Sequence, residues 1–146
     1  MVWRAPCLGF CNPRHRIPGD TVRTDLLRVL ITDEERALLF SLSNYLTFRG
    51  CLVDCTERFD DARALVRHLH YDVVVLGLSP GSDLSQANSL TADIRAFGPG
   101  TRVVALAAEA KEEGGEPLSP LAADQVIERH LPLDQLAWCV CSAIAA

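Results

Sequence analysis

From Leu26 onward, the sequence alternates between short apolar runs of strand length and longer segments with the apolar spacing of helices. The run at residues 71–76 is the clearest, because it is apolar and β-branched without polar alternation, as in strands buried on both faces. Similar runs predict strands at residues 27–31, 51–55, 102–106 and 124–127. Strands that alternate with helices pair in parallel, so the sequence predicts an α/β domain with a five-stranded, mostly parallel, doubly wound sheet.

Helices are predicted between these strands, where apolar residues recur every three or four positions. The predicted ranges are about 34–48, 60–70, 83–97 and 132–144. Residues 109–120 occupy the place of a further helix, but they contain two glycines and two prolines, the residue types least compatible with a helix interior. We therefore expect the fourth helix of the domain to be irregular.

The N-terminal residues differ from the rest of the chain. Residues 1–25 are rich in proline and arginine and lack hydrophobic periodicity, which predicts a flexible tail before a single domain at residues 26–146. No apolar stretch has the length of a membrane span or the form of a signal peptide. We therefore expect a cytoplasmic protein without a membrane partner.

The net charge of the chain disfavours one class of partner, and the spacing of its cysteines disfavours a bound metal. The chain has 14 Lys and Arg against 19 Asp and Glu, and its net charge of −5 is unfavourable for binding nucleic acid. The six cysteines have no Cys-x-x-Cys spacing, and the Cys7, Cys11 and His15 group is interrupted by prolines. We expect no metal and no disulfide framework, with the other four cysteines acting as small buried hydrophobic residues.

In a doubly wound sheet, ligands bind beyond the carboxyl ends of the strands, so the residues there are candidate site residues. The first strand is followed by Asp33 and Glu34, a carboxylate pair of the kind that binds Mg²⁺. The later strands bring Gly77, Ala107 and Arg129 to the same edge. The sequence has no Gly-rich phosphate loop, catalytic triad or Cys-His pair, so no catalytic residue is assigned and no enzyme activity is expected.

The strand ends resemble those of the response-regulator receiver domain of bacterial two-component signalling, the CheY-like family with a flavodoxin-like sheet. The matching segments are residues 28–34, 71–78, 103–108 and 126–129. The spacing matches as well, with 30 residues from Gly77 to Ala107 and 22 from Ala107 to Arg129. With the helical segments included, the resemblance extends from Leu26 to the C-terminus.

The resemblance assigns a role to each strand end. In that family an acidic pair binds Mg²⁺, an aspartate after the third strand accepts phosphoryl from a histidine kinase, and a hydroxyl residue and a lysine hold the phosphoryl group. Asp33 and Glu34 match the acidic pair, but Gly77 stands at the acceptor position, Ala107 at the hydroxyl position and Arg129 at the lysine position. The resemblance therefore implies a degenerate pseudo-receiver without a phospho-acceptor, and with Mg²⁺ binding that is weak or absent.

The remaining charged residues predict a contact that replaces the cation. Asp33 and Glu34 repel each other when no cation is present, and Arg129 can supply a planar, permanently charged partner. We predict an ion pair between Arg129 and these carboxylates; the alternative is that the carboxylates only favour the N-terminus of the next helix. Phosphoryl transfer to Asp54 or Asp83 is a further alternative, although neither residue is predicted beside the acidic pair.

A domain without catalysis acts through its surface. Helical spacing places Phe40 and Trp138 outside the core-facing stripes, so we predict that both belong to one interaction surface. Candidate partners are a histidine kinase, a separate effector and a second copy of the chain. The implied function is a stand-alone, phosphorylation-independent interaction module in two-component-type signalling; the alternative is a small-ligand or anion sensor that uses Arg129 and His130.

Overall fold

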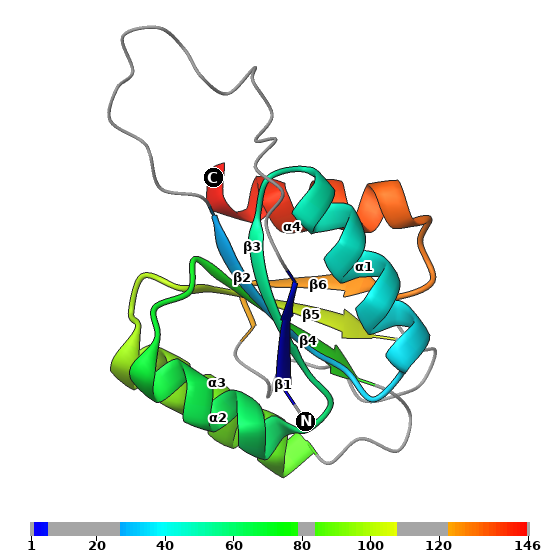
Figure 1. Cartoon of the computed structure of the whole chain (residues 1–146). Helices are drawn as coiled ribbons and strands as arrows, with labels where there is room; N and C mark the ends of the chain where they lie inside the picture. Colours follow the sequence, from blue (N-terminus) through cyan, green and yellow to red (C-terminus); the bar gives the residue numbers. More distant parts are fainter. Residues whose placement is uncertain (1, 6–26, 79–83, 108–122, 146) are drawn as a thin grey trace, which may run out of the picture.

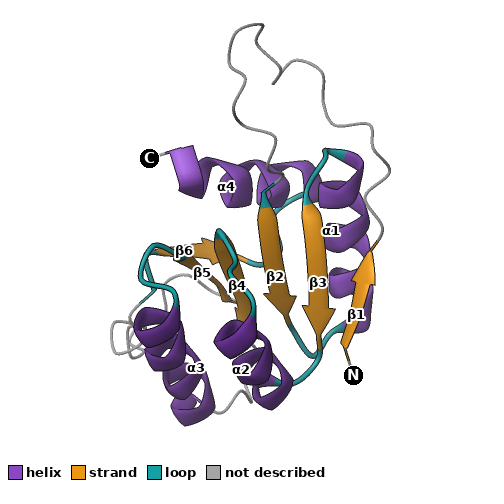
Figure 2. Cartoon of the chain, turned by 60° about the vertical axis from the view of Figure 1, so that its left-hand side comes forward, coloured by secondary structure: helices purple, strands orange, loops and turns teal. Residues whose placement is uncertain are grey.

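The structure is a computed structural model that describes residues 2–5, 27–78, 84–107 and 123–145. These residues form one sheet of six strands, in the order β1-β3-β2-β4-β5-β6. The strands are β1 (Val2–Ala5), β2 (Arg28–Thr32), β3 (Leu52–Thr56), β4 (Val73–Leu78), β5 (Arg102–Ala107) and β6 (Gln125–Glu128). Strands β2 to β6 are parallel to one another, and Figure 2 shows β1 at one edge of the sheet.

Four helices cover the two faces of the sheet in the described part of the chain. They are α1 (Arg36–Phe48), α2 (Phe59–His68), α3 (Leu84–Phe97) and α4 (Leu133–Ala145). Helices α1 and α4 lie on one face and α2 and α3 on the other, which gives the molecule three layers (Figure 1). Among the described residues, no helix has the length and apolarity that crossing a membrane requires.

Two hydrophobic layers flank the sheet, because successive side chains of a strand point to opposite faces. In β2, Val29 and Ile31 pack with residues of α1 and α4, whereas Leu30 packs with residues of α2 and α3. All six residues of β4 are buried, as expected for a strand covered on both sides. The two layers fix the register, since a shift by one residue would exchange the side chains that face them.

The predicted fold class is confirmed, with five parallel strands that alternate with helices. The clearest predicted strand, residues 71–76, is observed slightly later, at Val73–Leu78. The four helices predicted at about 34–48, 60–70, 83–97 and 132–144 are all present. The irregular helix expected at residues 109–120 lies outside the described residues.

The prediction for the N-terminus is wrong in part. Residues 1–25 are predicted to be a flexible tail, but Val2–Ala5 form β1, which pairs with β3 in an antiparallel arrangement. Without this pairing β3 would be an edge strand, whose backbone N–H and C=O groups lack partners on one side. Val2 and Trp3 are also residue types that favour strands. Residues 6–26 lie outside the described residues.

The parallel register assembles the strand ends predicted to carry the site. Thr32, the last residue of β2, is aligned with Leu76 of β4. The next residues along these two strands, Asp33 and Gly77, are therefore neighbours at the carboxyl edge. Strand β6 ends one residue before Arg129, so the same edge also receives this cation.

Candidate functional site

Asp33 is held at the carboxyl edge by its backbone and by its side chain. Its backbone N–H donates a 3.2 Å hydrogen bond to the Thr56 carbonyl at the end of β3. Its Oδ1 accepts a 2.8 Å hydrogen bond from the Glu35 backbone N–H, which forms an Asx turn immediately before α1. The Asp33 side chain is almost completely buried, with 2% of its surface exposed.

Arg129 reaches Asp33 from the opposite side of the site. Its backbone N–H donates a 2.8 Å hydrogen bond to the Ala107 carbonyl, which places it directly after β6. Its Nη2 lies 2.9 Å from Asp33 Oδ1 and 3.1 Å from Glu35 Oε1, and its Nη1 donates a 3.0 Å bond to the Leu78 carbonyl. We call Arg129 with these three acceptors the Arg129 clamp.

The electrostatics of the Arg129 clamp favour a charged guanidinium. Burial by itself lowers the pKa of Arg129, but the hydrogen bonds and negative charges of Asp33 and Glu35 outweigh it, so the pKa lies above its ordinary value. Arg129 is therefore a permanent cation beside the buried carboxylate of Asp33. A buried ion pair with several hydrogen bonds is strongly coupled, since removal of one partner leaves the other charge buried and unpaired.

At position 77 the space beside the backbone is already occupied, so only glycine fits without movement of its neighbours. A Cβ at this position would lie 1.8 Å from Asp33 Oδ2, 2.3 Å from Asp33 Cγ and 2.8 Å from Asp33 Cβ. The carboxylate of Asp33 thus fills the space that a side chain on residue 77 would enter. Asp33 Oδ2 is buried and, among the described residues, has no hydrogen-bond partner.

The receiver resemblance implies a Mg²⁺ site at this edge, but the residues present do not fit a Mg²⁺ ion. Mg²⁺ takes six oxygen ligands in nearly octahedral geometry. Asp33 Oδ1 instead contacts the Arg129 cation, Asp33 Oδ2 points at Gly77, and Gly77 brings no carboxylate. No group of three or more His, Cys, Asp or Glu side chains within the described residues is arranged to hold a metal ion.

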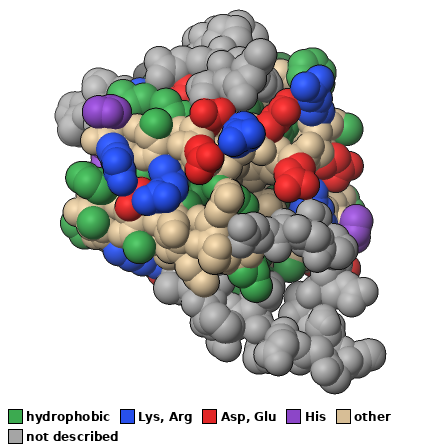
Figure 3. Space-filling view, turned by 90° about the horizontal axis from the view of Figure 1, so that it is seen from below, with side chains coloured by type: hydrophobic (Ala, Val, Ile, Leu, Met, Phe, Trp, Pro, Cys, Tyr) green, Lys and Arg blue, Asp and Glu red, His purple; other side chains and the backbone are tan. Residues whose placement is uncertain are grey.

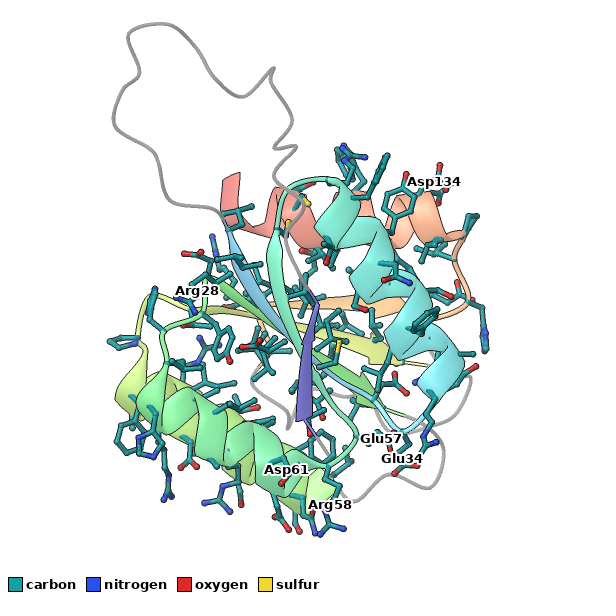
Figure 4. All side chains as sticks on the ribbon, in the orientation of Figure 1. Arg28, Glu34, Glu57, Arg58, Asp61 and Asp134 are labelled. Carbon is teal, nitrogen blue, oxygen red and sulfur yellow. The ribbon has the colours of Figure 1, made fainter. Side chains whose placement is uncertain are left out.

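The predicted ion pair between Arg129 and the acidic segment is present, but its second carboxylate differs from the prediction. Glu34 is exposed and lies at the lower end of the molecule below α1 (Figure 4). Glu35 takes its place as the partner of Arg129. The Asx turn explains the difference, because it directs residue 34 outward and brings residue 35 back toward Asp33.

A cavity of about 300 Å³ lies beside the Arg129 clamp, between the start of α1 and the start of α4. Its walls include Glu35, Arg129 and His130 as well as Leu38 and Leu133. Figure 3 shows acidic and basic side chains interspersed on the described part of the face seen from below. Within the Arg129 clamp, two carboxylates, Asp33 and Glu35, face one guanidinium, so the clamp has no net positive charge to attract an anion.

The two predicted surface aromatics lie on the helices that cover the same face of the sheet. Phe40 on α1 is 61% exposed and Trp138 on α4 is 66% exposed. Helices α1 and α4 pack against each other, so both side chains belong to the outer surface of one helix layer. Large exposed aromatic side chains are typical of surfaces that bind proteins.

Comparison with solved structures identifies the architecture. The chain matches a response regulator receiver domain from Methanospirillum hungatei with a TM-score of 0.69 and 19% identity, over 83% of this chain and 95% of that one. A response regulator from Thermotoga maritima matches with a TM-score of 0.69 and 22% identity, over 84% of this chain and 100% of that one. The chain has the receiver-domain fold.

A third similar structure was solved with a bound metal ion. Thermotoga maritima TrrA, a response regulator solved in complex with Mg²⁺ and BeF, matches with a TM-score of 0.65 and 24% identity, over 81% of this chain and 99% of that one. No protein-family model matches the sequence. No curated protein matches it either. At these identities the likeness shows the fold alone.

Proposed function

We propose that this chain is a degenerate receiver domain that acts in the cytoplasm as a phosphorylation-independent interaction module in two-component-type signalling, without enzyme activity. One observation carries the proposal: the position of the phospho-acceptor is occupied by the buried carboxylate of Asp33, which Arg129 holds in place. A receiver fold in this state has neither room nor ligands for a phosphoryl group at the end of β4. The domain therefore has one signalling state, which does not depend on phosphorylation.

The Arg129 clamp provides, from within the chain, the positive charge that a divalent cation provides in a receiver that accepts phosphoryl. In a receiver that accepts phosphoryl, the acidic residues need a divalent cation, and the phosphoryl group needs a hydroxyl and a cationic side chain. Here the guanidinium neutralises Asp33 directly, at 2.9 Å, and no hydroxyl is available from the buried Ala107. Because Arg129 stays charged at every physiological pH, the clamp favours one conformation continuously.

Intact-mass spectrometry after incubation with Mg²⁺ and acetyl phosphate tests the proposal. The natural chain is expected to gain no phosphoryl group, whereas a Gly77→Asp/Ala107→Thr/Arg129→Lys variant restores the missing groups and is expected to gain about 80 Da. Gly77→Asp alone is expected to remain unmodified, because the new side chain meets Asp33 while Arg129 still holds it. A base-labile adduct on the natural chain would overturn the proposal and assign the acceptor to another carboxylate, such as Asp54 or Asp83.

The output of such a module depends on a surface, and the layer formed by α1 and α4 supports this role best. Phe40 and Trp138 place two large aromatic side chains on it. A protein partner, either a histidine kinase or a separate effector, would bury these rings. A second copy of the chain could bury them in the same way, because a two-fold dimer uses the same patch twice.

The double variant Phe40→Ser/Trp138→Ser is expected to abolish self-association while its thermal unfolding midpoint stays close to that of the natural chain, because both side chains are mostly exposed. Sedimentation velocity at a series of protein concentrations measures the association. Leu84→Ser is the matched control, since Leu84 is an exposed apolar residue on α3, at the opposite face of the sheet. If the natural chain is monomeric at all concentrations, the homodimer is excluded as the partner.

The cavity beside the Arg129 clamp favours a second candidate function, a small-ligand sensor. It lies at the carboxyl edge of the sheet, where ligands of doubly wound folds bind. Its leucine side chains and its mixed charges fit a neutral or zwitterionic molecule. They fit less well the anion that the sequence predicts as an alternative ligand. His130 is exposed and lines the cavity, whereas Arg129 is engaged with Asp33 and Glu35.

A further inference from the structure

The cavity beside the Arg129 clamp has an apolar wall that is part of the core of the domain. Four leucine side chains line it, namely Leu38 on α1, Leu131 before α4, and Leu133 and Leu136 on α4. Leu136 belongs to the buried layer between the sheet and these two helices, and the other three leucines pack against that layer. The volume of about 300 Å³ is at the lower end of the range for small-molecule sites, so the cavity fits a small ligand with an apolar part.

Arg129 has more hydrogen-bond donors than the Arg129 clamp uses. A guanidinium carries five N–H groups, and three of them donate to Asp33, Glu35 and the Leu78 carbonyl. The remaining two, on Nε and Nη1, have no acceptor within the described part of the chain. The Arg129 side chain is only 6% exposed, and it forms part of the cavity wall. Because a buried donor without a partner is unfavourable, these two N–H groups favour an acceptor inside the cavity.

Glu35 brings a carboxylate oxygen to the same cavity. Its Oε1 accepts a 3.1 Å hydrogen bond from Arg129 Nη2, whereas its Oε2 has no hydrogen-bond partner among the described residues. Asp33 and Glu35 together carry two negative charges against the single positive charge of Arg129. A ligand that places a positive group on Glu35 would balance this surplus and form a charge-assisted hydrogen bond.

We propose that this cavity binds a free α-amino acid with an aliphatic side chain, such as leucine. The ammonium group of the ligand donates to Glu35 Oε2, its carboxylate accepts from the two remaining N–H groups of Arg129, and its side chain packs on the four leucines. An α-amino acid carries both charged groups on one carbon, which suits two protein groups that are themselves 3.1 Å apart. A carboxylic acid alone would add negative charge, and an amine alone would leave the Arg129 N–H groups without an acceptor.

This inference rests on the second candidate function, the small-ligand sensor, and names the class of its ligand. The bound amino acid would contact the start of α1 through Glu35 and Leu38, and the start of α4 through Leu133. These two helices pack against each other and carry the exposed Phe40 and Trp138. Ligand binding would therefore act on the helix layer that forms the proposed interaction surface.

Isothermal titration calorimetry of the full chain with L-leucine at neutral pH tests the inference. Isocaproate, which is leucine without its amino group, and isoamylamine, which is leucine without its carboxylate, are the matched probes. Leucine is expected to bind at least about tenfold more tightly than either probe, because each probe lacks one charged hydrogen-bonding group. Glycine lacks the aliphatic side chain and is also expected to bind at least about tenfold more weakly than leucine.

Three single variants locate the ligand. Glu35→Gln removes the charge but keeps the size of a side chain that is 57% exposed, so the variant is expected to fold and to bind leucine at least about tenfold more weakly. Glu34→Gln is the matched control, because Glu34 is the adjacent exposed glutamate and does not line the cavity, and it is expected to leave the affinity unchanged. Leu133→Ser shortens the apolar wall and is expected to reduce the preference for leucine over glycine.

The possible results separate this inference from the function on which it rests. If isocaproate or isoamylamine binds as tightly as leucine, the amino-acid class is overturned, but the cavity still serves a small-ligand sensor. Leucine binding that Glu35→Gln and Leu133→Ser leave unchanged would put the ligand elsewhere and overturn the site. If none of the four compounds binds at millimolar concentration, the inference and the sensor function are both overturned, whereas the phosphorylation-independent interaction module is unaffected.

Discussion

Arg129→Met is expected to lower the free energy of unfolding by about 3–5 kcal/mol, the usual cost of removing one partner of a buried ion pair. The reason is that Asp33 would remain buried with its charge no longer paired, since its side chain is only 2% exposed. Methionine keeps much of the length and apolar volume of the arginine stem, so the effect reports the charge and its hydrogen bonds. Urea unfolding at neutral pH, followed by circular dichroism, measures the change.

Two comparisons separate the Arg129 clamp from an ordinary surface contact. Arg36→Met removes the arginine of the Arg36–Glu57 ion pair, whose Nε–Oε2 distance is 2.6 Å but whose arginine side chain is 81% exposed. An exposed pair contributes about 0–1 kcal/mol, so this control is expected to change stability little. Asp33→Asn combined with Arg129→Met removes both charges and is expected to recover part of the loss. If Arg129→Met costs no more than Arg36→Met, the clamp does not hold the site.

The order of strands and helices could be predicted because the hydrophobic pattern carries it directly. The small displacement of β4 shows the limit of that pattern. Tyr71 is apolar and buried but precedes the strand, where its hydroxyl donates a 2.5 Å hydrogen bond to Asp54 Oδ2 in β3. At the other end the strand continues through Gly77, a residue type that strands disfavour, because pairing with β5 extends to Leu78.

Two residues of β1 favour strands, but the four residues alone are not sufficient to predict one. A four-residue strand has too few contacts to be stable by itself, and Val2–Ala5 become a strand only by pairing with the edge of β3. Nothing in the local sequence identifies that edge. The pairing is a property of the assembled sheet, and the local proline and arginine content pointed instead to a tail.

The candidate site could be predicted at the level of residue types but not of geometry. An arginine and a run of acidic residues at neighbouring strand ends are sufficient to predict an ion pair. The choice of Glu35 over Glu34 depends on the Asx turn at Asp33, and the Leu78 carbonyl contributes an acceptor that no side-chain pattern reveals. An acidic residue two positions after an aspartate, just before a helix, is the signal that would have identified Glu35.

Gly77→Ala is expected to lower the free energy of unfolding by about 2–4 kcal/mol, because it adds a methyl group to occupied space and disrupts a buried polar contact. The added Cβ would lie 1.8 Å from Asp33 Oδ2 and 2.8 Å from Asp33 Cβ. Rotation of the carboxylate alone relieves only the first of these overlaps, so the backbone of β2 or β4 must also move. Any such movement weakens the 2.9 Å contact between Asp33 and Arg129.

Gly100→Ala is the matched control for this change, because a Cβ at Gly100 meets no atom within 4 Å and is expected to be neutral or slightly stabilising. The cause is tested in an Asp33→Gly background, which removes all three atoms of Asp33 that a Cβ at residue 77 would meet, its Cβ included. There, Gly77→Ala is expected to cost less than about 1 kcal/mol, which gives a coupling free energy of the size found for residues in direct contact. An equal cost in both backgrounds would mean that Asp33 does not fill the acceptor position, and would remove the physical basis for treating this receiver fold as closed to phosphorylation.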